Sequence, residues 1–196
     1  MEITYLGLAA FRIKGKTATV VTDPYAPEHA GLKFPKHITA DIVTVSRDLP
    51  EYNAIHQVEG TAYVVNGPGE YEIKGVGVIG LSTFHDEENG AKRGKNTMYR
   101  IEMDGLAIVH LGDLSHTLSV AEVGTLDGVD ILIVAAGTAV SVIHEIEPSI
   151  VIPMRYTRDE LTAFLKEIGK EDVTAQSKLS ITKDKLPEQM QVVILE

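Results

Sequence analysis

The first half of the chain has the pattern of short β-strands. Apolar and β-branched residues alternate with polar ones or form brief continuous runs, and glycine, proline, asparagine or aspartate separates these runs. Such runs are typical of strands joined by turns. The predicted strands span residues 2–8, 10–14, 17–22, 42–45, 61–65, 70–73, 76–81, 96–103 and 106–111. We expect residues 23–39 and 87–95 to be loops, because prolines interrupt the first segment and glycines and charges the second.

Two turns within this half have clear signals. Asp104 and Gly105 lie between two strand runs, and an Asp-Gly pair in that place favours the type I′ turn of a two-residue hairpin. The stretch from Asn66 to Gly69 has the composition of a turn whose glycines allow positive φ. These signals indicate that neighbouring strands pair as hairpins.

The pattern changes in the second half to strands alternating with helices. Ser119 and Glu122 match the capping box that begins a helix. Predicted helices span residues 119–126, 138–145 and 158–168. Predicted strands span 129–135 and 150–153, and a last pair of strands spans 178–182 and 191–195. Hairpins followed by βα units favour two mixed β-sheets flanked by helices, an α/β sandwich of four layers in the order αββα.

Composition limits the classes of function. The chain has 196 residues, of which 44% are hydrophobic, so we expect one domain over residues 1–196. A formal net charge of -10 argues against nucleic acid and anionic membranes as partners. The chain has no cysteine, so any metal would need histidine and carboxylate ligands. Neither a signal peptide nor a membrane-spanning run is present, and we expect a soluble cytoplasmic protein.

Charged and polar residues follow the strand at 42–45 directly, and such a cluster brings functional side chains to the edge of a sheet. This stretch resembles the signature of the metallo-β-lactamase superfamily, Ser/Thr-His-x-His-x-Asp-His after an Ala-Asp-hydrophobic strand. Further segments also resemble the small single-domain branch of Zn-dependent hydrolases. These segments are Leu6-Gly7-Leu8-Ala9-Ala10-Phe11, Asp23-Pro24, the residues from Gly67 to Glu72, His85-Asp86, the residues from Arg93 to Thr97, Gly112-Asp113 and Pro153-Met154-Arg155.

The resemblance implies a dinuclear metal site whose hydroxide attacks an ester, amide or phosphate. Positions 47, 49 and 85 would hold one metal, positions 51, 52 and 155 the other, and Asp113 would be shared. Most of these ligands are replaced, because Arg47, Leu49, Glu51 and Tyr52 stand where the family has His, His, Asp and His, and Arg155 replaces a terminal His. Only His85, Glu51 and Asp113 remain as weak metal candidates. We therefore expect no cofactor, with zinc or manganese at a rebuilt mononuclear site as the alternative.

The replacements suggest a ligand pocket formed by Arg47, Asp48, Tyr52 and Arg155. Our hypothesis is that the two arginines pair with Asp113 and Glu51 in place of the lost cations; the alternative is that they point to solvent. Asp113, His116 and Glu51 are the candidate catalytic residues. His116 is either a proton-transfer group near Asp113 or a surface residue, and His85 is either a remaining ligand or a strand-end histidine bonded to Asp86 or the backbone.

Two functions follow from the resemblance. The first is a member with a degenerate metal site that lacks dinuclear hydrolase activity and acts as a binding, regulatory or assembly protein for a small molecule or a protein. The second is a hydrolase of an ester, lactone or phosphodiester that uses a rebuilt mononuclear site, or metal-free acid and base chemistry. The substrate and the oligomeric state do not follow from the sequence.

Overall fold

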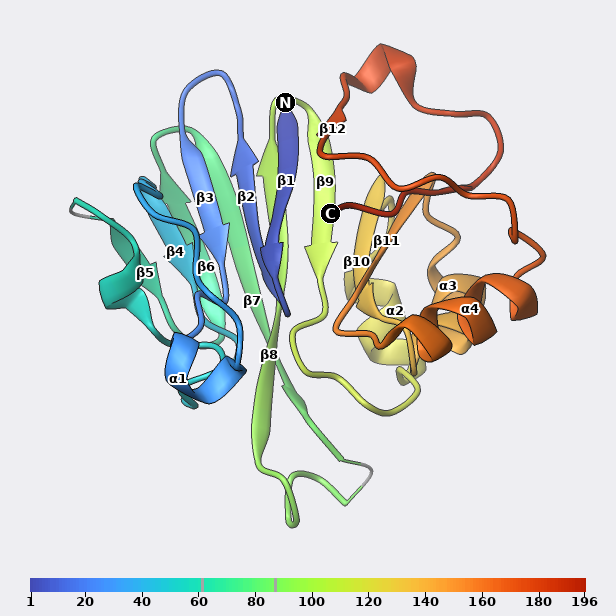
Figure 1. Ribbon diagram of the computed structural model, residues 1–196, viewed down its shortest axis with the longest axis horizontal. Helices are drawn as coiled ribbons and strands as arrows, with labels where there is room; N and C mark the ends of the chain where they lie inside the picture. Colours follow the sequence, from blue (N-terminus) through green and yellow to red (C-terminus); the bar gives the residue numbers. More distant parts are fainter. Residues whose placement is uncertain (61, 87) are drawn as a thin grey trace.

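Two mixed β-sheets pack face to face in the computed structural model, which describes residues 1–60, 62–86 and 88–196 (Figure 1). In the first sheet, β3 is parallel to β4 and β4 to β5, whereas the other pairs are antiparallel. Its strands, in spatial order, are β12 (Leu179–Ser180), β1 (Glu2–Gly7), β2 (Ala10–Lys14), β3 (Thr19–Thr22), β4 (Ile42–Thr44) and β5 (Tyr63–Val65).

The second sheet has an antiparallel half and a parallel half. Strands β6 to β9 pair as successive hairpins, and β9, β10, β11 and β13 are parallel to one another. Its strands, in spatial order, are β13 (Gln191–Val192), β11 (Ile150–Met154), β10 (Ile131–Ala135), β9 (Leu106–His110), β8 (Lys95–Met103), β7 (Val76–Phe84) and β6 (Gly69–Ile73). Side chains of β9 and β11 are buried on both faces, which explains why these strands read as continuous apolar runs.

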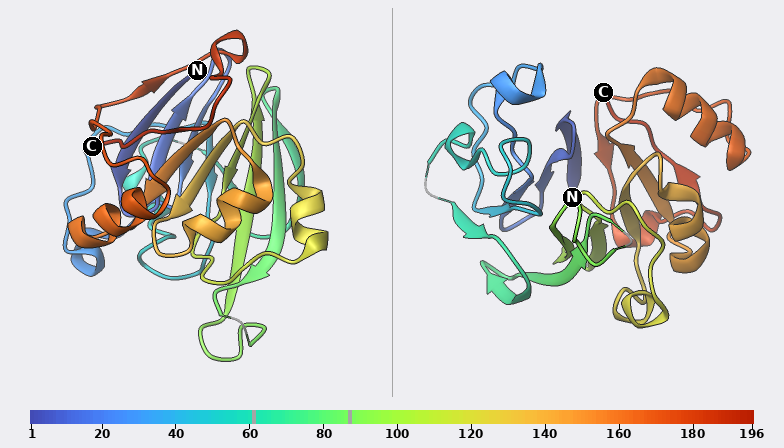
Figure 2. Two further views of the ribbon diagram at one scale, coloured as in Figure 1. Left: turned by 90° about the vertical axis from the view of Figure 1, so that its right-hand side faces the viewer. Right: turned by 90° about the horizontal axis from the view of Figure 1, so that it is seen from below.

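Three apolar clusters hold the layers together. One fills the space between the sheets, with Phe11, Ile101 and Ile133 among its members. A second packs α2 (Val120–Thr125), α3 (Ala139–Ile146) and α4 (Arg158–Glu167) onto the outer face of the second sheet (Figure 2). The third covers the outer face of the first sheet with loops and the one-turn helix α1 (Pro27–Ala30). The molecule thus has the predicted αββα layering, with a thin outer layer on the first sheet.

Local signals in the sequence have the expected conformations. Asp104 and Gly105 have φ values of 55° and 79°, and a type I′ turn requires positive φ at both positions. The Ser119 hydroxyl accepts from the backbone N–H of Glu122, whose side chain accepts from Ser119, so the capping box is confirmed. Thr157 and Glu160 form a second capping box at the start of α4.

Two expectations were wrong, and two others include a residue that the structure does not describe. Residues 23–39 were expected to be loop and contain α1, which begins at Pro27, where a missing N–H costs nothing. The last two predicted strands, 178–182 and 191–195, do not form a pair with each other, because β12 borders β1 and β13 borders β11 in the other sheet. Thr61 of the predicted strand 61–65 and Glu87 of the predicted loop 87–95 lie outside the described residues. Among the residues that are described, no helix is long and apolar enough to cross a membrane.

Candidate functional site

Strand ends from both sheets meet at one edge of the molecule. Strands β1, β3 and β4 run in one direction in the first sheet, as do β7, β9 and β11 in the second. Arrows of β1 and β9 point the same way in Figure 1. The two edges are joined by backbone hydrogen bonds from Arg155 N–H to Leu8 O (3.2 Å) and from Thr97 N–H to Ser46 O (3.0 Å). The loops that follow these strands therefore carry the candidate site.

Asp113 lies at the centre of this edge, in the loop after β9. Its side chain is 8% exposed, and its two carboxylate oxygens contact different arginines. Arg47, which follows β4, donates to Oδ2, and Arg155, which follows β11, donates to Oδ1. Burial raises the pKa of Asp113 to about 6, and the hydrogen bond from Arg47 opposes this rise. An ionised Asp113 thus has a guanidinium on each oxygen at neutral pH.

The ring of Tyr52 packs against the guanidinium groups of both arginines. The guanidinium carbon of Arg155 lies 5.0 Å from the centroid of the Tyr52 ring and that of Arg47 lies 5.9 Å away. Both distances fall within the range in which a cation is attracted to the ring face. Tyr52 itself is buried, so the ring is fixed and holds the two guanidinium groups beside Asp113.

His85, at the end of β7, has both ring nitrogens engaged. Its Nδ1 contacts the backbone carbonyl of Asp113 and lies 3.1 Å from Asp113 Oδ2, and its Nε2 lies 3.0 Å from Arg93 Nη1. Arginine can only donate, so Nε2 accepts and the proton of the neutral ring resides on Nδ1. Burial lowers the pKa of His85, and the charges of Arg47 and Arg93 lower it further. A neutral imidazole therefore completes the cluster.

The buried side-chain amide of Asn96 holds the backbone of the Asp113 loop through hydrogen bonds. Asn96 Oδ1 accepts from Asp113 N–H (2.9 Å), and its Nδ2 donates to Leu111 O (3.0 Å) and to Thr83 Oγ1 (2.9 Å). Gly112 has φ +61°, and a Cβ there would lie 2.5 Å from Asn96 Oδ1. Only glycine therefore lets the backbone approach Asn96 closely enough to place Asp113.

Asp23 and His110 form a second buried pair behind the arginine cluster. Asp23 accepts hydrogen bonds from the backbone N–H and the hydroxyl of Ser46, both at 2.7 Å, and lies 3.8 Å from His110 Nδ1. His110 Nδ1 accepts from Gly112 N–H and Nε2 donates to Ala9 O, which fixes a neutral ring. Burial raises the pKa of Asp23 to about 7 and lowers that of His110 to about 4. The pair supports the loops that carry Arg47 and Asp113.

The two metal ions implied by the resemblance do not fit these side chains. Two guanidinium groups occupy the carboxylate of Asp113, and Arg93 faces the Nε2 of His85. A divalent cation would be repelled by three arginines that cannot be deprotonated. Leu49 offers no donor atom, and the described residues contain no cluster of three metal-ligating side chains. The donor set here is suited to ion pairing within the protein.

The structure separates the other predicted site residues. Glu51 lines a cavity of about 140 Å³ beside Tyr52 and Arg155. Asp48 is exposed, accepts from Asn53 Nδ2 at 2.6 Å, and lines a different hollow with Arg47. His116 bonds to the carbonyl of Thr117 at 2.7 Å and has no contact with Asp113 within the described part of the chain. The ligand-pocket residues therefore do not surround a single space.

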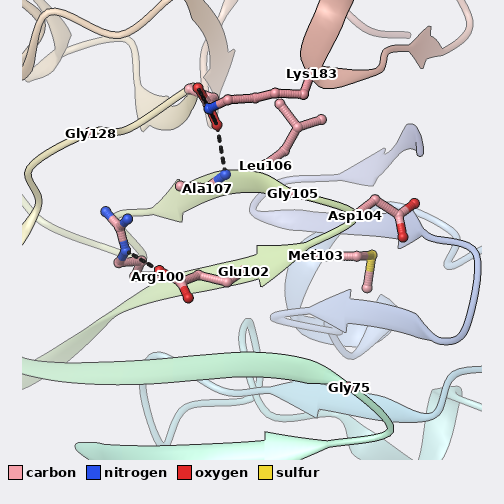
Figure 3. Close-up of a pocket in the computed structure, with 11 residues that line it drawn as sticks. Gly75, Arg100, Glu102, Met103, Asp104, Gly105, Leu106, Ala107, Gly128 and Lys183 are labelled. Carbon is pink, nitrogen blue, oxygen red and sulfur yellow. Dashed lines mark hydrogen bonds and ion pairs between the residues drawn. The ribbon is translucent and has the colours of Figure 1, made fainter.

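A further hollow of about 380 Å³ lies at the other end of β9 (Figure 3). Lys183 pairs with Asp130 at 2.7 Å, and Arg100 pairs with Glu102 at 3.1 Å. Asp130 also accepts from the backbone N–H of Ala107. Because both basic side chains of this hollow are already paired and Asp104 lies 3.7 Å from the amino group of Met1, it offers a ligand less than the edge that carries Asp113.

Sequence reasoning did not assign Arg93, Asp23, Ser46, Asn96 or His110 to the site. Asp23, Ser46, Arg93 and Asn96 belong to segments that carried the resemblance, so their motifs were a usable signal. His110 had no comparable signal, since a lone histidine in an apolar strand is as often a structural residue.

Known proteins resemble the chain in sequence and in structure. The sequence profile of the beta-lactamase superfamily domain matches residues 2–155. A proposed Zn-dependent hydrolase of the metallo-beta-lactamase superfamily from Thermotoga maritima shares 30% identity over 99% of this chain and 97% of its own, with a TM-score of 0.76. No functionally curated protein matches the chain in sequence.

More distant structures share the fold alone. An isothiocyanate hydrolase from Delia radicum gut bacteria has 13% identity and a TM-score of 0.70 over 93% of this chain and 100% of its own. Igni18, a metallo hydrolase from the archaeon Ignicoccus hospitalis, has 15% identity and a TM-score of 0.62 over 92% of this chain and 99% of its own.

Proposed function

Because this chain belongs to the metallo-β-lactamase superfamily, we propose that it is a member whose metal site has been replaced by an ion-pair cluster and that it acts as a binding or regulatory protein. The cluster comprises Arg47, Arg155, Asp113, His85 and Arg93. In this proposal the guanidinium groups take the place of the two metal cations and neutralise the carboxylate that the family uses to bridge them.

One observation carries the proposal: each oxygen of Asp113 already has an arginine as its partner. Carboxylates with charge-assisted hydrogen bonds are poor metal ligands, because binding would require the arginines to leave and expose their charge. Tyr52 stacks under both guanidinium groups and adds to the cost of moving them. Hydroxide generation on a metal has no support from this donor set.

The alternative is a hydrolase of an ester, lactone or phosphodiester at a mononuclear zinc or manganese site. The hydrolase names of the structural neighbours favour it by analogy only. It requires Arg47 and Arg155 to leave Asp113, so that His85, Glu51 and Asp113 could bind one ion. Metal content separates the two functions.

Elemental analysis after loading with zinc or manganese and desalting tests the proposal. We expect well below one ion per chain. The positive control carries Arg47→His, Leu49→His, Glu51→Asp, Tyr52→His and Arg155→His, which restores the family's ligand types at the matching positions. Near-stoichiometric metal in the unmodified protein would overturn the proposal.

We also propose that residues 1–196 form one domain. The apolar cluster between the sheets contains residues from β1, β8, β10 and β12, so neither sheet buries its inner face alone. Cooperative unfolding in a single transition would be the expected result.

A further inference from the structure

A small cavity opens beside the arginine cluster. We call it the Arg155 cavity; it encloses about 140 Å³ and is lined by Leu8, His29, Ala30, Glu51, Tyr52 and Arg155. Its walls come from the ends of β1 and β11, from α1 and from the loop after β4. Segments far apart in the sequence therefore build one space next to Asp113.

Arg155 and Glu51 bring opposite charges to this cavity, and no ion pair among the described residues joins them. Arg155 donates through Nη1 to Asp113, and the other N–H groups of its guanidinium have no acceptor among the described residues. The carboxylate of Glu51 likewise makes no hydrogen bond or ion pair within the described part of the chain, and none joins it to Arg155. Arg155 is exposed and Glu51 half-buried, so only water competes with a ligand for these charged groups.

Apart from the exposed His29, the rest of the lining suits a compact aliphatic group. Tyr52 is 3% exposed and presents its ring, and Leu8 and Ala30 add apolar surface. The backbone of Leu8 is fixed, because its carbonyl accepts from Arg155 N–H (3.2 Å) and from the Tyr5 hydroxyl (3.1 Å). The cavity is thus preorganised on one side, which favours binding of a small molecule.

We propose that the Arg155 cavity binds a small zwitterion with a carboxylate and an ammonium group, such as a short α-amino acid. The carboxylate would accept from the free N–H groups of Arg155, and the ammonium group would donate to Glu51. A cavity of this size holds a ligand of about six non-hydrogen atoms, since a cavity of roughly 150 Å³ accommodates benzene. This inference rests on the proposed function, because a metal at Asp113 and Glu51 would remove one of the two charges.

Titration by nuclear magnetic resonance, with three probes at constant ionic strength, tests the inference. L-alanine carries both charges, propionate only the carboxylate and ethylamine only the ammonium group. We expect L-alanine to shift backbone amide signals saturably and to bind at least tenfold more tightly than either single-charge probe. Equal binding of propionate and L-alanine, or no saturable shift with L-alanine, would overturn the inference.

Matched variants locate the site. Glu51→Gln should weaken L-alanine binding at least tenfold, and it should fold normally because the Glu51 carboxylate has no partner among the described residues. Glu28→Gln, an exposed change on α1, should leave binding unchanged. Arg155→Gln should weaken binding as well, with the exposed Arg158→Gln as its control. Binding that survives Glu51→Gln would refute the assignment.

The failure of this inference is distinguishable from that of the proposed function. If the protein is metal-free and does not bind L-alanine, only the proposed ligand of the Arg155 cavity is refuted. If the protein retains stoichiometric metal, the proposed function is refuted, whatever the titration with L-alanine shows.

Discussion

The guanidinium carbon of Arg155 lies 5.0 Å from the centre of the buried Tyr52 ring. Tyr52→Leu should lower the free energy of unfolding by about 2–4 kcal/mol, because it removes a buried ring and the cation–π contact of two arginines. Tyr52→Phe keeps the ring and should cost less than about 1 kcal/mol, since the hydroxyl has no partner among the described residues. Urea unfolding measures both. Similar losses in the two variants would show that the ring does not support the arginines.

Removal of the carboxylate of Asp113 should destabilise the site through the arginines that remain. Asp113→Asn leaves Arg47 and Arg155 beside a neutral amide, and we expect a loss of about 3 kcal/mol. Adding Arg47→Gln and Arg155→Gln to this variant should recover part of that loss, because the uncompensated charge disappears. Chemical denaturation of the single and triple variants tests the expectation. A further loss in the triple variant would contradict the ion-pair cluster.

His110 and Asp23 should affect the pH dependence of stability in opposite directions. Burial lowers the pKa of His110 from 6.5 to about 4, so between these values only the unfolded chain binds the proton and stability rises with pH. Burial raises the pKa of Asp23 from 3.8 to about 7, so the folded chain holds the extra proton and stability falls as pH rises.

Each group should change the free energy of unfolding by about 1.4 kcal/mol per pH unit within its own range. Single variants should separate the two contributions. In Asp23→Asn the free energy of unfolding should rise with pH between pH 4 and 6.5, because His110 still titrates. In His110→Gln it should fall as pH rises between pH 4 and 7, because Asp23 still titrates. Urea unfolding in half-unit steps of pH gives both profiles. Profiles that run parallel to that of the parent protein would show that neither group titrates as described.

Gly112→Ala tests the close approach of the Asp113 loop to Asn96. The new Cβ would meet Asn96 Oδ1 at 2.5 Å and Ser46 Cβ at 2.6 Å, so we expect a loss of about 3 kcal/mol. Gly128→Ala is the matched control, because Gly128 has φ +69° with no atom within 4 Å of a new Cβ. It should cost about 1 kcal/mol from backbone strain alone. Equal losses of stability in the two variants would mean that the structure around position 112 relaxes and relieves the clash.

Local patterns in the sequence predicted the elements well. Strand β2 has the predicted bounds, and the capping box at Ser119 and the positive φ values of Asp104 and Gly105 follow from local chemistry. The pairing of Arg47 and Arg155 with Asp113 was also expected, because the resemblance assigned all three to one pocket. The expected pairing with Glu51 is not found among the described residues.

Contacts between residues far apart in the sequence could not be predicted from it. Arg93 reaches His85 through the loop between β7 and β8, and no periodicity specifies such a path. His110 meets Ala9 across 101 positions, by packing of one sheet on the other. Strands β12 and β13 have two residues each, so their patterns are too short to indicate which sheet each one joins.

The placement of β12 beside β1 has a consequence for how the protein folds. The backbone carbonyl of Ile181 accepts from the amino group of Met1, a contact between residues 180 positions apart. Contacts this remote form late and slow the folding reaction, because loop-closure entropy must be overcome first. Until they form, β1 has an open edge that could pair with another chain. Aggregation during refolding should therefore depend on how fast residues 179–181 dock.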